Sequence, residues 1–227
     1  MRKLVTVLWA LTFAVQAYAL SLDDISNKDA TGGLKEALTQ GASAAVARLG
    51  KTDGFLGDPK VKIQLPDGLR QAESLMRTMG MGKQADELVT AMNRAAESAV
   101  AEAKPILVDA VKKMSVQDAK QILTGGDDSV TQYFRRTTSE QLTQKFKPVV
   151  TRATEKVQLA QKYDQYAGQG AKLGLVKEQD AKVENYVTRK ALDGLFLMIA
   201  EEERAIRQNP VGAAGGLAKK VFGALGQ

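Results

Sequence analysis

The clearest guide to the fold class is a stretch near the carboxyl end, YVTRKALDGLFLMIAEEERAIR, residues 186–207. On a helical wheel, which advances about 100° per residue, its apolar side chains gather on one side and most of its charged ones, with Tyr186, on the other. Arg189 and Asp193 stand four residues apart on the charged side, a spacing that lets opposite charges pair along a helix. We therefore expect a long helix that packs on a core through its apolar side and carries a solvated charged face. Glu202 is the one charge that projects onto the apolar side.

The preceding sequence shows the same helical spacing, interrupted by glycine and proline. Gly80 and Gly82 break one run, Pro105 marks a kink or a new start, and Gly125-Gly126 separates two further runs. The fold class that this pattern predicts is all-α, a multi-helix single domain. The expected helices span about residues 34–49, 66–79, 83–103, 115–123, 127–137, 138–167, 178–207 and 217–225.

Two hydroxyl residues are expected to begin helices. Ser115-x-x-Asp118 is a capping box with Asp in the usual Glu or Gln place. Thr138-Ser139 has the composition of another helix start, and Pro148 is expected to kink or restart the helix that follows.

One segment, residues 55–65, departs from the helical pattern. Val61, Ile63 and Leu65 alternate with Lys62 and Gln64, which is the period of a half-buried strand. We expect a short extended or hairpin segment here. Two interpretations stay open: an extended arm packed across the helices, or an edge that pairs with a partner protein by strand addition.

The two ends of the chain suggest export and a surface helix. Residues 1–19 combine a basic start, an apolar run and Ala17-Tyr18-Ala19, the layout of a cleaved signal peptide. Residues 20–227 are then one helical domain, within which residues 208–227 include a short amphipathic helix with Lys219 and Lys220 at its flank. This helix either docks on its own domain or makes weak contact with an anionic membrane.

The composition excludes several classes of site. The chain has neither histidine nor cysteine, which removes histidine general bases, Ser-His-Asp and Cys-His arrangements, structural zinc sites and iron–sulfur clusters. Its net charge of +6 would fall to +4 on loss of Arg2 and Lys3, and no Lys/Arg block is present. We therefore expect no nucleic-acid partner, no cofactor and no metal.

The candidate ligand-binding residues are Tyr133, Arg135 and Arg136, within YFRRTT at residues 133–138. Two guanidinium groups beside hydroxyls at an expected helix junction would suit a phosphate or a lipid headgroup. Ion pairs with acidic residues nearby in the sequence are the structural alternative. No catalytic residues are predicted.

Three further motifs are interpreted as structural. GMGKQA, residues 80–85, matches a dinucleotide-binding pattern, but a helix precedes it where that chemistry requires a strand, so we expect a helix–helix turn. M-x-x-M-x-M at residues 76–81 is more typical of gap-filling methionines than of a copper site. Asn93, Arg94 and Glu97 lie opposite an apolar stripe, and we expect them on a solvated face.

Four long blocks resemble a family of exported bacterial proteins catalogued as a domain of unknown function. They are GLKEALTQGASAAVARLGKTDGFLGDPKVKIQLP, MNRAAESAVAEAKPI, YFRRTT and YVTRKALDGLFLMIAEEERAIRQNP. The resemblance covers nearly all of the chain after residue 19. It implies a helical protein exported in bacteria with a two-membrane envelope, and it implies no activity or catalytic residues.

The function expected from these features is that of a periplasmic, non-catalytic binding or scaffold protein. A lipid or another apolar or amphiphilic ligand between the helices fits the broad apolar stripes. One alternative is a carboxylate- or lysine-based hydrolase, since carboxylates and lysines are the reactive groups that remain. Another is an envelope-surface interaction protein that uses the edge at residues 61–65 or the basic carboxyl-terminal helix.

Overall fold

Helices account for the regular structure in the computed structural model, which describes residues 27–80, 82–155 and 158–209. No strand occurs in these ranges, so the predicted all-α fold is confirmed. The helices are α1 (Asn27–Leu49), α2 (Arg70–Thr78), α3 (Gly82–Val100), α4 (Lys104–Lys113), α5 (Val116–Thr124), α6 (Ser129–Thr154), α7 (Gln158–Lys172) and α8 (Val183–Gln208), with short 3-10 turns η2 (Asp67–Leu69) and η3 (Glu178–Asp180).

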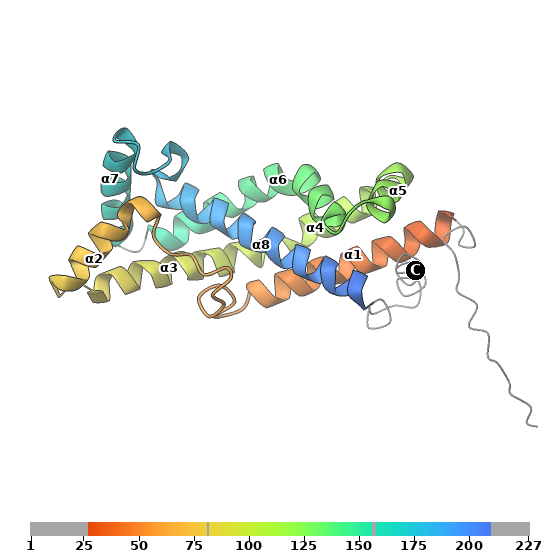
Figure 1. The fold of residues 1–227 in the computed structure, drawn as a ribbon, viewed down its shortest axis with the longest axis horizontal. Coiled ribbons are helices and arrows are strands. Elements are labelled where there is room, and N and C mark those ends of the chain that lie inside the picture. The colour runs from red at the N-terminus through yellow and green to blue at the C-terminus, as the bar shows by residue number, and fades with distance from the viewer. Residues whose placement is uncertain (1–26, 81, 156–157, 210–227) are drawn as a thin grey trace, which may run out of the picture.

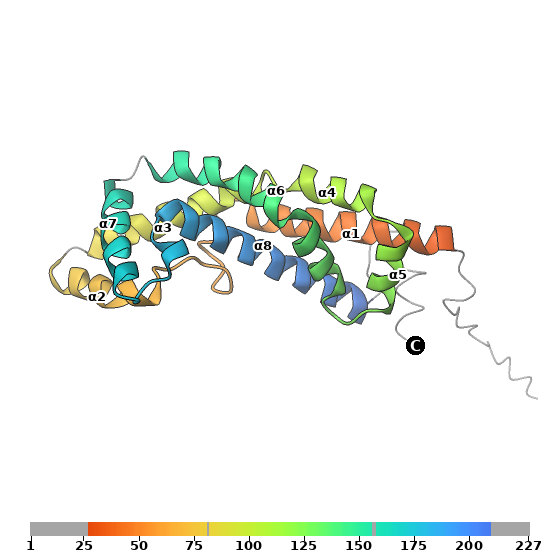
Figure 2. The same cartoon turned by 90° about the horizontal axis from the view of Figure 1, so that it is seen from above.

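Helix α8, which contains the stretch at residues 186–207, packs against α6, α3 and α1. It runs beside these helices along the long direction of the molecule (Figures 1 and 2). α2 and α7 lie at one end of the bundle, and α5 lies at the opposite end (Figure 1). The apolar side predicted for this stretch therefore faces the core.

Small residues on α3 allow the neighbouring helices to come close. Ala95, Ala96 and Ala99 are fully buried, and α3 packs against both α6 and α8. The same core contains fully buried aromatic side chains such as Phe134 of α6 and Phe196 of α8. Burying one such ring stabilises the fold by about 1.5–3 kcal/mol.

Most of the predicted helix boundaries are confirmed. The hydroxyl of Ser115 accepts a hydrogen bond from the backbone N–H of Asp118, and the Asp118 carboxylate accepts one from the N–H of Ser115, which completes the capping box. Gly80 has φ of +78° between α2 and α3, where the GMGKQA motif was expected to form a helix–helix turn. Pro105 stands in the first turn of α4, so it marks a new start.

The expected helix start at Thr138 is wrong, because α6 continues through it. The Thr138 hydroxyl donates to the carbonyl of Phe134 at 2.6 Å, four residues back, and so is used within the helix. Pro148 also lies inside α6. The YFRRTT motif therefore lies inside a continuous helix and not at a junction.

The extended segment packs across the helices as an arm. Val61, Ile63 and Leu65 are buried, whereas Lys62 and Gln64 are exposed, as the alternation predicted. The backbone of Ile63 forms two hydrogen bonds with the Asn93 side chain of α3, each 2.8 Å long. This confirms the interpretation of the segment as an arm held by its own domain.

The expectation of a solvated face at Asn93 and Glu97 is wrong. Asn93 is fully buried, and Glu97 is 4% exposed. Oε1 of Glu97 accepts hydrogen bonds from the backbone N–H groups of Phe55 at 3.1 Å and Leu56 at 3.2 Å, and Oε2 pairs with Arg94 at 2.7 Å. Both side chains point inward because they bind backbone of the arm.

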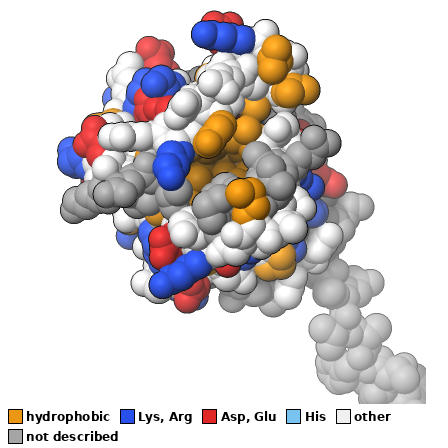
Figure 3. All heavy atoms as spheres, turned by 90° about the vertical axis from the view of Figure 1, so that its left-hand side faces the viewer, with side chains coloured by type: hydrophobic (Ala, Val, Ile, Leu, Met, Phe, Trp, Pro, Cys, Tyr) orange, Lys and Arg blue, Asp and Glu red, His pale blue; other side chains and the backbone are white. Residues whose placement is uncertain are grey.

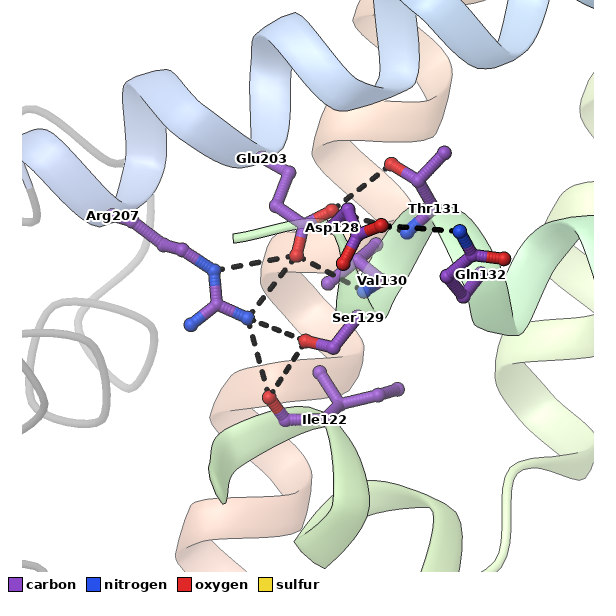
Figure 4. Close-up of polar contacts among 8 residues, drawn as sticks. All are labelled: Ile122, Asp128, Ser129, Val130, Thr131, Gln132, Glu203 and Arg207. Carbon is purple, nitrogen blue, oxygen red and sulfur yellow. Dashed lines mark hydrogen bonds and ion pairs between the residues drawn. The ribbon is translucent and has the colours of Figure 1, made fainter. Parts of the chain in front are cut away.

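A buried carboxylate joins α8 to the beginning of α6 (Figure 4). Oε1 of Glu203 accepts from the backbone N–H of Val130, and Oε2 accepts from the N–H and the hydroxyl of Thr131, all at 3.0 Å. Arg207 neutralises this carboxylate at 3.1 Å and donates to the Ser129 hydroxyl at 2.7 Å. Glu203 thus caps a helix to which it is not joined in sequence.

No helix in the described part of the chain is long and apolar enough to cross a membrane. The predicted signal peptide at residues 1–19 lies outside the described residues, and so does the amphipathic helix predicted at residues 217–225.

Candidate functional site

A polar cleft of about 470 Å³ lies at the end of the bundle that carries α2 and α7. Three segments line it: residues 62–70 from the arm and η2, and, more than 100 residues later in the sequence, residues 175–180 after α7 and residues 186–190 on α8. Its volume is in the range typical of small-ligand sites.

Two of these segments touch through backbone atoms at Gly68. A Cβ atom at this position would lie 2.1 Å from the carbonyl oxygen of Leu175, a distance that no side chain tolerates. Next to it, Leu69 is buried in the core. This wall of the cleft therefore requires glycine at residue 68.

Tyrosine hydroxyls fix the inner wall. Tyr186 donates to the carbonyl of Gln64 at 2.7 Å, and Tyr163 of α7 donates to the carbonyl of Asp180 at 2.9 Å. The two rings stack with their centroids 6.0 Å apart. Burial raises the pKa of Tyr186 to about 12 and also raises the pKa of Tyr163. Both hydroxyls are therefore neutral donors at ordinary pH.

The cleft floor contains a bidentate ion pair between α8 and the segment before it. Arg189 Nε and Nη2 lie 2.9 and 2.7 Å from the two carboxylate oxygens of the buried Asp180. The predicted pair with Asp193 is also present, at 3.3 Å. The expected solvated face is wrong for Tyr186, which is buried, and incomplete for Arg189, whose shorter ion pair is with Asp180.

The charge of the cleft is strongly basic. Five basic side chains line it against two carboxylates, Asp67 and Asp180. Each carboxylate already has an arginine partner, Arg70 at 2.9 Å and Arg189 at 2.7 Å. The cations that remain are Lys62, Lys177 and Lys190.

No carboxylate among the described residues forms an ion pair with these three lysines. Lys190 Nζ lies 5.9 Å from the centre of the Tyr186 ring, which is within the range of a cation–π contact. The cleft thus has positive charge that its own acidic residues do not neutralise.

The predicted site residues lie elsewhere, in the amino-terminal third of α6. Tyr133 is buried, and its hydroxyl donates to the Ala110 carbonyl at 2.7 Å. Arg136 pairs with Asp118 at 3.1 Å, and the Arg135 guanidinium lies 4.6 Å from the centre of the Phe196 ring. None of the three lines the basic cleft. Their role in ligand binding stays a prediction.

The three buried carboxylates of the described residues are used by the fold. Glu97 holds the arm, Asp180 holds Arg189, and Glu203 caps α6. A general base needs an acceptor oxygen within reach of substrate, and these oxygens already accept hydrogen bonds. Within the described residues, no group of three acidic side chains has the arrangement of a metal site.

An apolar cavity between α1, α6 and α8 has a volume of only about 20 Å³. It is lined by residues such as Leu38, Phe134 and Ile206. A cavity needs roughly 10–15 Å³ to hold one water molecule, so this one is far too small for an acyl chain.

The fold and the cleft define an all-helical protein with a basic pocket at one end of its bundle. The chain belongs to the family described as Protein of unknown function (DUF4197), which matches residues 24–223. The family resemblance inferred from the sequence blocks is therefore confirmed. No curated protein and no solved structure matches the chain.

Proposed function

We propose that this protein is a non-catalytic binding protein of the periplasm whose basic cleft holds a small phosphate-bearing anion. The observation that supports it most is the set of three lysines, Lys62, Lys177 and Lys190, which line one cleft and have no carboxylate of the described residues within ion-pair distance. The charge of Lys62 does act on Asp86 at longer range, where it helps to lower the pKa of that carboxyl. A lysine ammonium is a compact charge that serves well as a phosphate ligand. A concave site with low-dielectric walls also concentrates the field of such charges.

The rigid walls of the cleft favour binding. Arg189 is held by Asp180 in a two-bond arrangement, and Tyr186 is held by the arm, so both side chains are in place before a ligand arrives. A preformed site loses less conformational entropy when it binds its ligand. Both carboxylates of the cleft are held by arginines, and its lysines are anchoring charges, which is why we propose binding and not hydrolysis.

The periplasmic location in this proposal is supported by the sequence of residues 1–19 alone. The basic start, the apolar run and the small residues before the expected cleavage point are those of an exported precursor. Cell fractionation with detection of the cleaved amino terminus tests it. A full-length chain that stays in the cytoplasm would contradict it.

Calorimetric titration with pyrophosphate at low ionic strength tests the cleft. We expect wild-type protein to bind and the Lys62→Gln/Lys190→Gln variant to bind at least about ten-fold more weakly, because two of the three unpaired charges are gone. Lys120→Gln, an exposed lysine on α5, is the matched control and should bind as wild type does.

The competing site on α6 is tested in the same titration. Arg135→Ala/Arg136→Ala should leave pyrophosphate binding unchanged if the cleft is the site. The proposal would be contradicted if Arg135→Ala/Arg136→Ala lost pyrophosphate binding while Lys62→Gln/Lys190→Gln bound normally. The binding site would then be at Arg135 and Arg136.

A further inference from the structure

The sequence KLGLVK, residues 172–177, forms the turn between α7 and η3 at the rim of the basic cleft. Leu173 is 74% exposed and Leu175 is 62% exposed. Two large apolar side chains this exposed within three residues leave a local apolar patch in water, and such patches often mark an interaction surface. Lys172 and Lys177, both exposed, flank the two leucines.

The backbone of this turn is well defined by hydrogen bonds. Leu175 N–H donates to the Gly170 carbonyl at 2.8 Å, and Gly174 N–H donates to the Ala171 carbonyl at 3.0 Å. Gly174 has φ of +73°. These features form a Schellman motif, the common end of an α-helix. The leucines are therefore presented by a fixed turn.

The Schellman motif usually places an apolar residue against the helix, and here that contact is missing. Leu175 is the residue that would pack against the third residue from the helix end, but Gly170 stands there and has no side chain. The side chain of Leu175 thus remains exposed although its backbone is anchored.

Exposed apolar residues concentrate at this end of the molecule. Met79 after α2 and Tyr166 on α7 are more than half exposed, as are Leu173 and Leu175. Viewed from this end, hydrophobic side chains gather near the middle of the face, and lysine and arginine side chains lie around them together with some acidic side chains (Figure 3). The face thus has the mixture of apolar and basic groups that suits an anionic lipid surface.

We propose that the KLGLVK turn is a membrane-contact surface: Leu173 and Leu175 enter the interfacial layer of an anionic bilayer while the adjacent lysines bind a lipid phosphate. The inference rests on the proposed function, because the lipid phosphate would bind in the same basic cleft that binds the small anion. Leu175 and Lys177 line that cleft, so a headgroup in it would lie next to the inserted turn.

Two observations favour a bilayer over a protein partner. The two leucines form a small apolar tip, whereas a stable protein interface needs roughly 800 Å² from each partner. The positive charge of the cleft is complementary to an anionic surface at the side where the leucines project. A lipid bound in this way keeps its acyl chains in the bilayer, so the 20 Å³ cavity of the core need not hold them.

Vesicle co-sedimentation of the full mature chain tests the surface. The probes are vesicles of phosphatidylcholine alone and vesicles with an equal amount of phosphatidylglycerol. We expect binding to the anionic vesicles, and about ten-fold or greater weakening in Leu173→Ser/Leu175→Ser, because the apolar contribution of two leucines is lost. Val116→Ser, an exposed valine on α5, is the matched control and should behave as wild type.

Leu173→Ser alone, at a residue that does not line the cleft, should also weaken vesicle binding and should bind pyrophosphate with wild-type affinity, which shows that its cleft and its fold are intact. Equal binding of wild type to both vesicle types, or no binding to either, would overturn the proposal. The proposal would also be overturned if the leucine substitutions did not change binding to anionic vesicles. If the protein still bound pyrophosphate in that case, the proposed anion site would be unaffected. Loss of pyrophosphate binding in Lys62→Gln/Lys190→Gln without any loss of vesicle binding would separate the two sites and overturn the shared role of the cleft.

Discussion

The side-chain amide of Asn93 forms hydrogen bonds with both backbone polar groups of Ile63, its N–H and its carbonyl. Oδ1 accepts from the Ile63 N–H, and Nδ2 donates to the Ile63 carbonyl, each at 2.8 Å. A neighbouring strand would make the same two bonds. Nδ2 also donates to the Val89 carbonyl at 2.7 Å, which holds the amide in place. One buried amide therefore substitutes for a sheet partner and lets an extended segment pack in an all-helical protein.

Replacing Asn93 by alanine should destabilise the protein substantially. The Ile63 N–H and carbonyl would both remain buried without their partner, at about 1–3 kcal/mol for each group. We expect the free energy of unfolding to fall by about 2–4 kcal/mol in urea denaturation. Ser98→Ala, at an exposed position of the same helix, should change it by less than about 0.5 kcal/mol. A wild-type midpoint for Asn93→Ala would contradict this role.

Alanine substitutions at two helical glycines should change the stability of the protein in opposite directions. A Cβ atom at Gly194 would lie 2.6 Å from Cε1 of the fully buried Phe55, whereas a Cβ atom at Gly168 meets nothing within 4 Å. Gly194→Ala should cost about 1–3 kcal/mol through overpacking. Gly168→Ala should be neutral or stabilise by up to about 1 kcal/mol, because alanine favours the helix. Thermal denaturation of both variants checks the sign, and equal shifts would contradict the packing.

Loss of the Glu203 carboxylate should destabilise the protein at the contact between α8 and the start of α6. Glu203→Ala leaves the N–H groups of Val130 and Thr131 without acceptors and Arg207 without this neutralising charge. We expect a loss of about 3–5 kcal/mol, and a smaller loss for Glu203→Gln, which keeps one acceptor oxygen. Glu202→Gln, at the neighbouring position, is the control. Similar denaturation midpoints for all three variants would show that the cap contributes little.

Tyr186 should make folding stability depend on alkaline pH. Burial raises the pKa of its hydroxyl to about 12, above the ordinary value of 10.0 that applies in the unfolded chain. The contribution of the neutral hydroxyl is complete below pH 10 and is lost as pH rises towards 12, because the unfolded chain releases this proton first. Tyr186→Phe should remove this part of the decline and one late step of the phenolate absorbance titration. An unchanged late step would contradict the burial of this hydroxyl.

Local signals in the sequence predict most helix boundaries. The capping box at Ser115, the break at Gly80 and the start at Pro105 depend on residues within one turn of each other, and all three are confirmed. Thr138 misleads because a threonine hydroxyl serves equally well as a helix cap or as a donor to the carbonyl four residues back, here Phe134. Only the surrounding packing selects between the two.

The buried polar groups are not predictable from helical spacing alone. A helical wheel assigns Asn93, Glu97 and Tyr186 to solvent because they are polar, yet each binds backbone of the arm, more than 29 residues away in the sequence. Glu202 is the charge that the wheel places on the apolar side, but the buried carboxylate is the adjacent Glu203. The wheel therefore locates the region of the cap without identifying the residue.

The basic cleft is equally difficult to predict from the sequence. Lys62, Lys177 and Lys190 come from three segments that show no common motif, and only the tertiary fold brings them to one cleft. The KLGLVK turn is the local feature that marks it, since two leucines between lysines directly after a helix end are unusual for a solvated loop. The paired arginines of YFRRTT suggest a ligand site at a helix junction, but α6 is continuous there and no junction exists.

The most direct test of the account is an amide-resolved NMR titration of the mature protein with pyrophosphate. The account predicts saturable shifts confined to residues 62–70, 175–180 and 186–190, the three segments that line the basic cleft. It also predicts that Lys62→Gln/Lys190→Gln moves the midpoint of these shifts to a pyrophosphate concentration at least about ten-fold higher. Shifts centred on Arg135 and Arg136, or no saturable shifts at all, would contradict the claim that this cleft binds the anion.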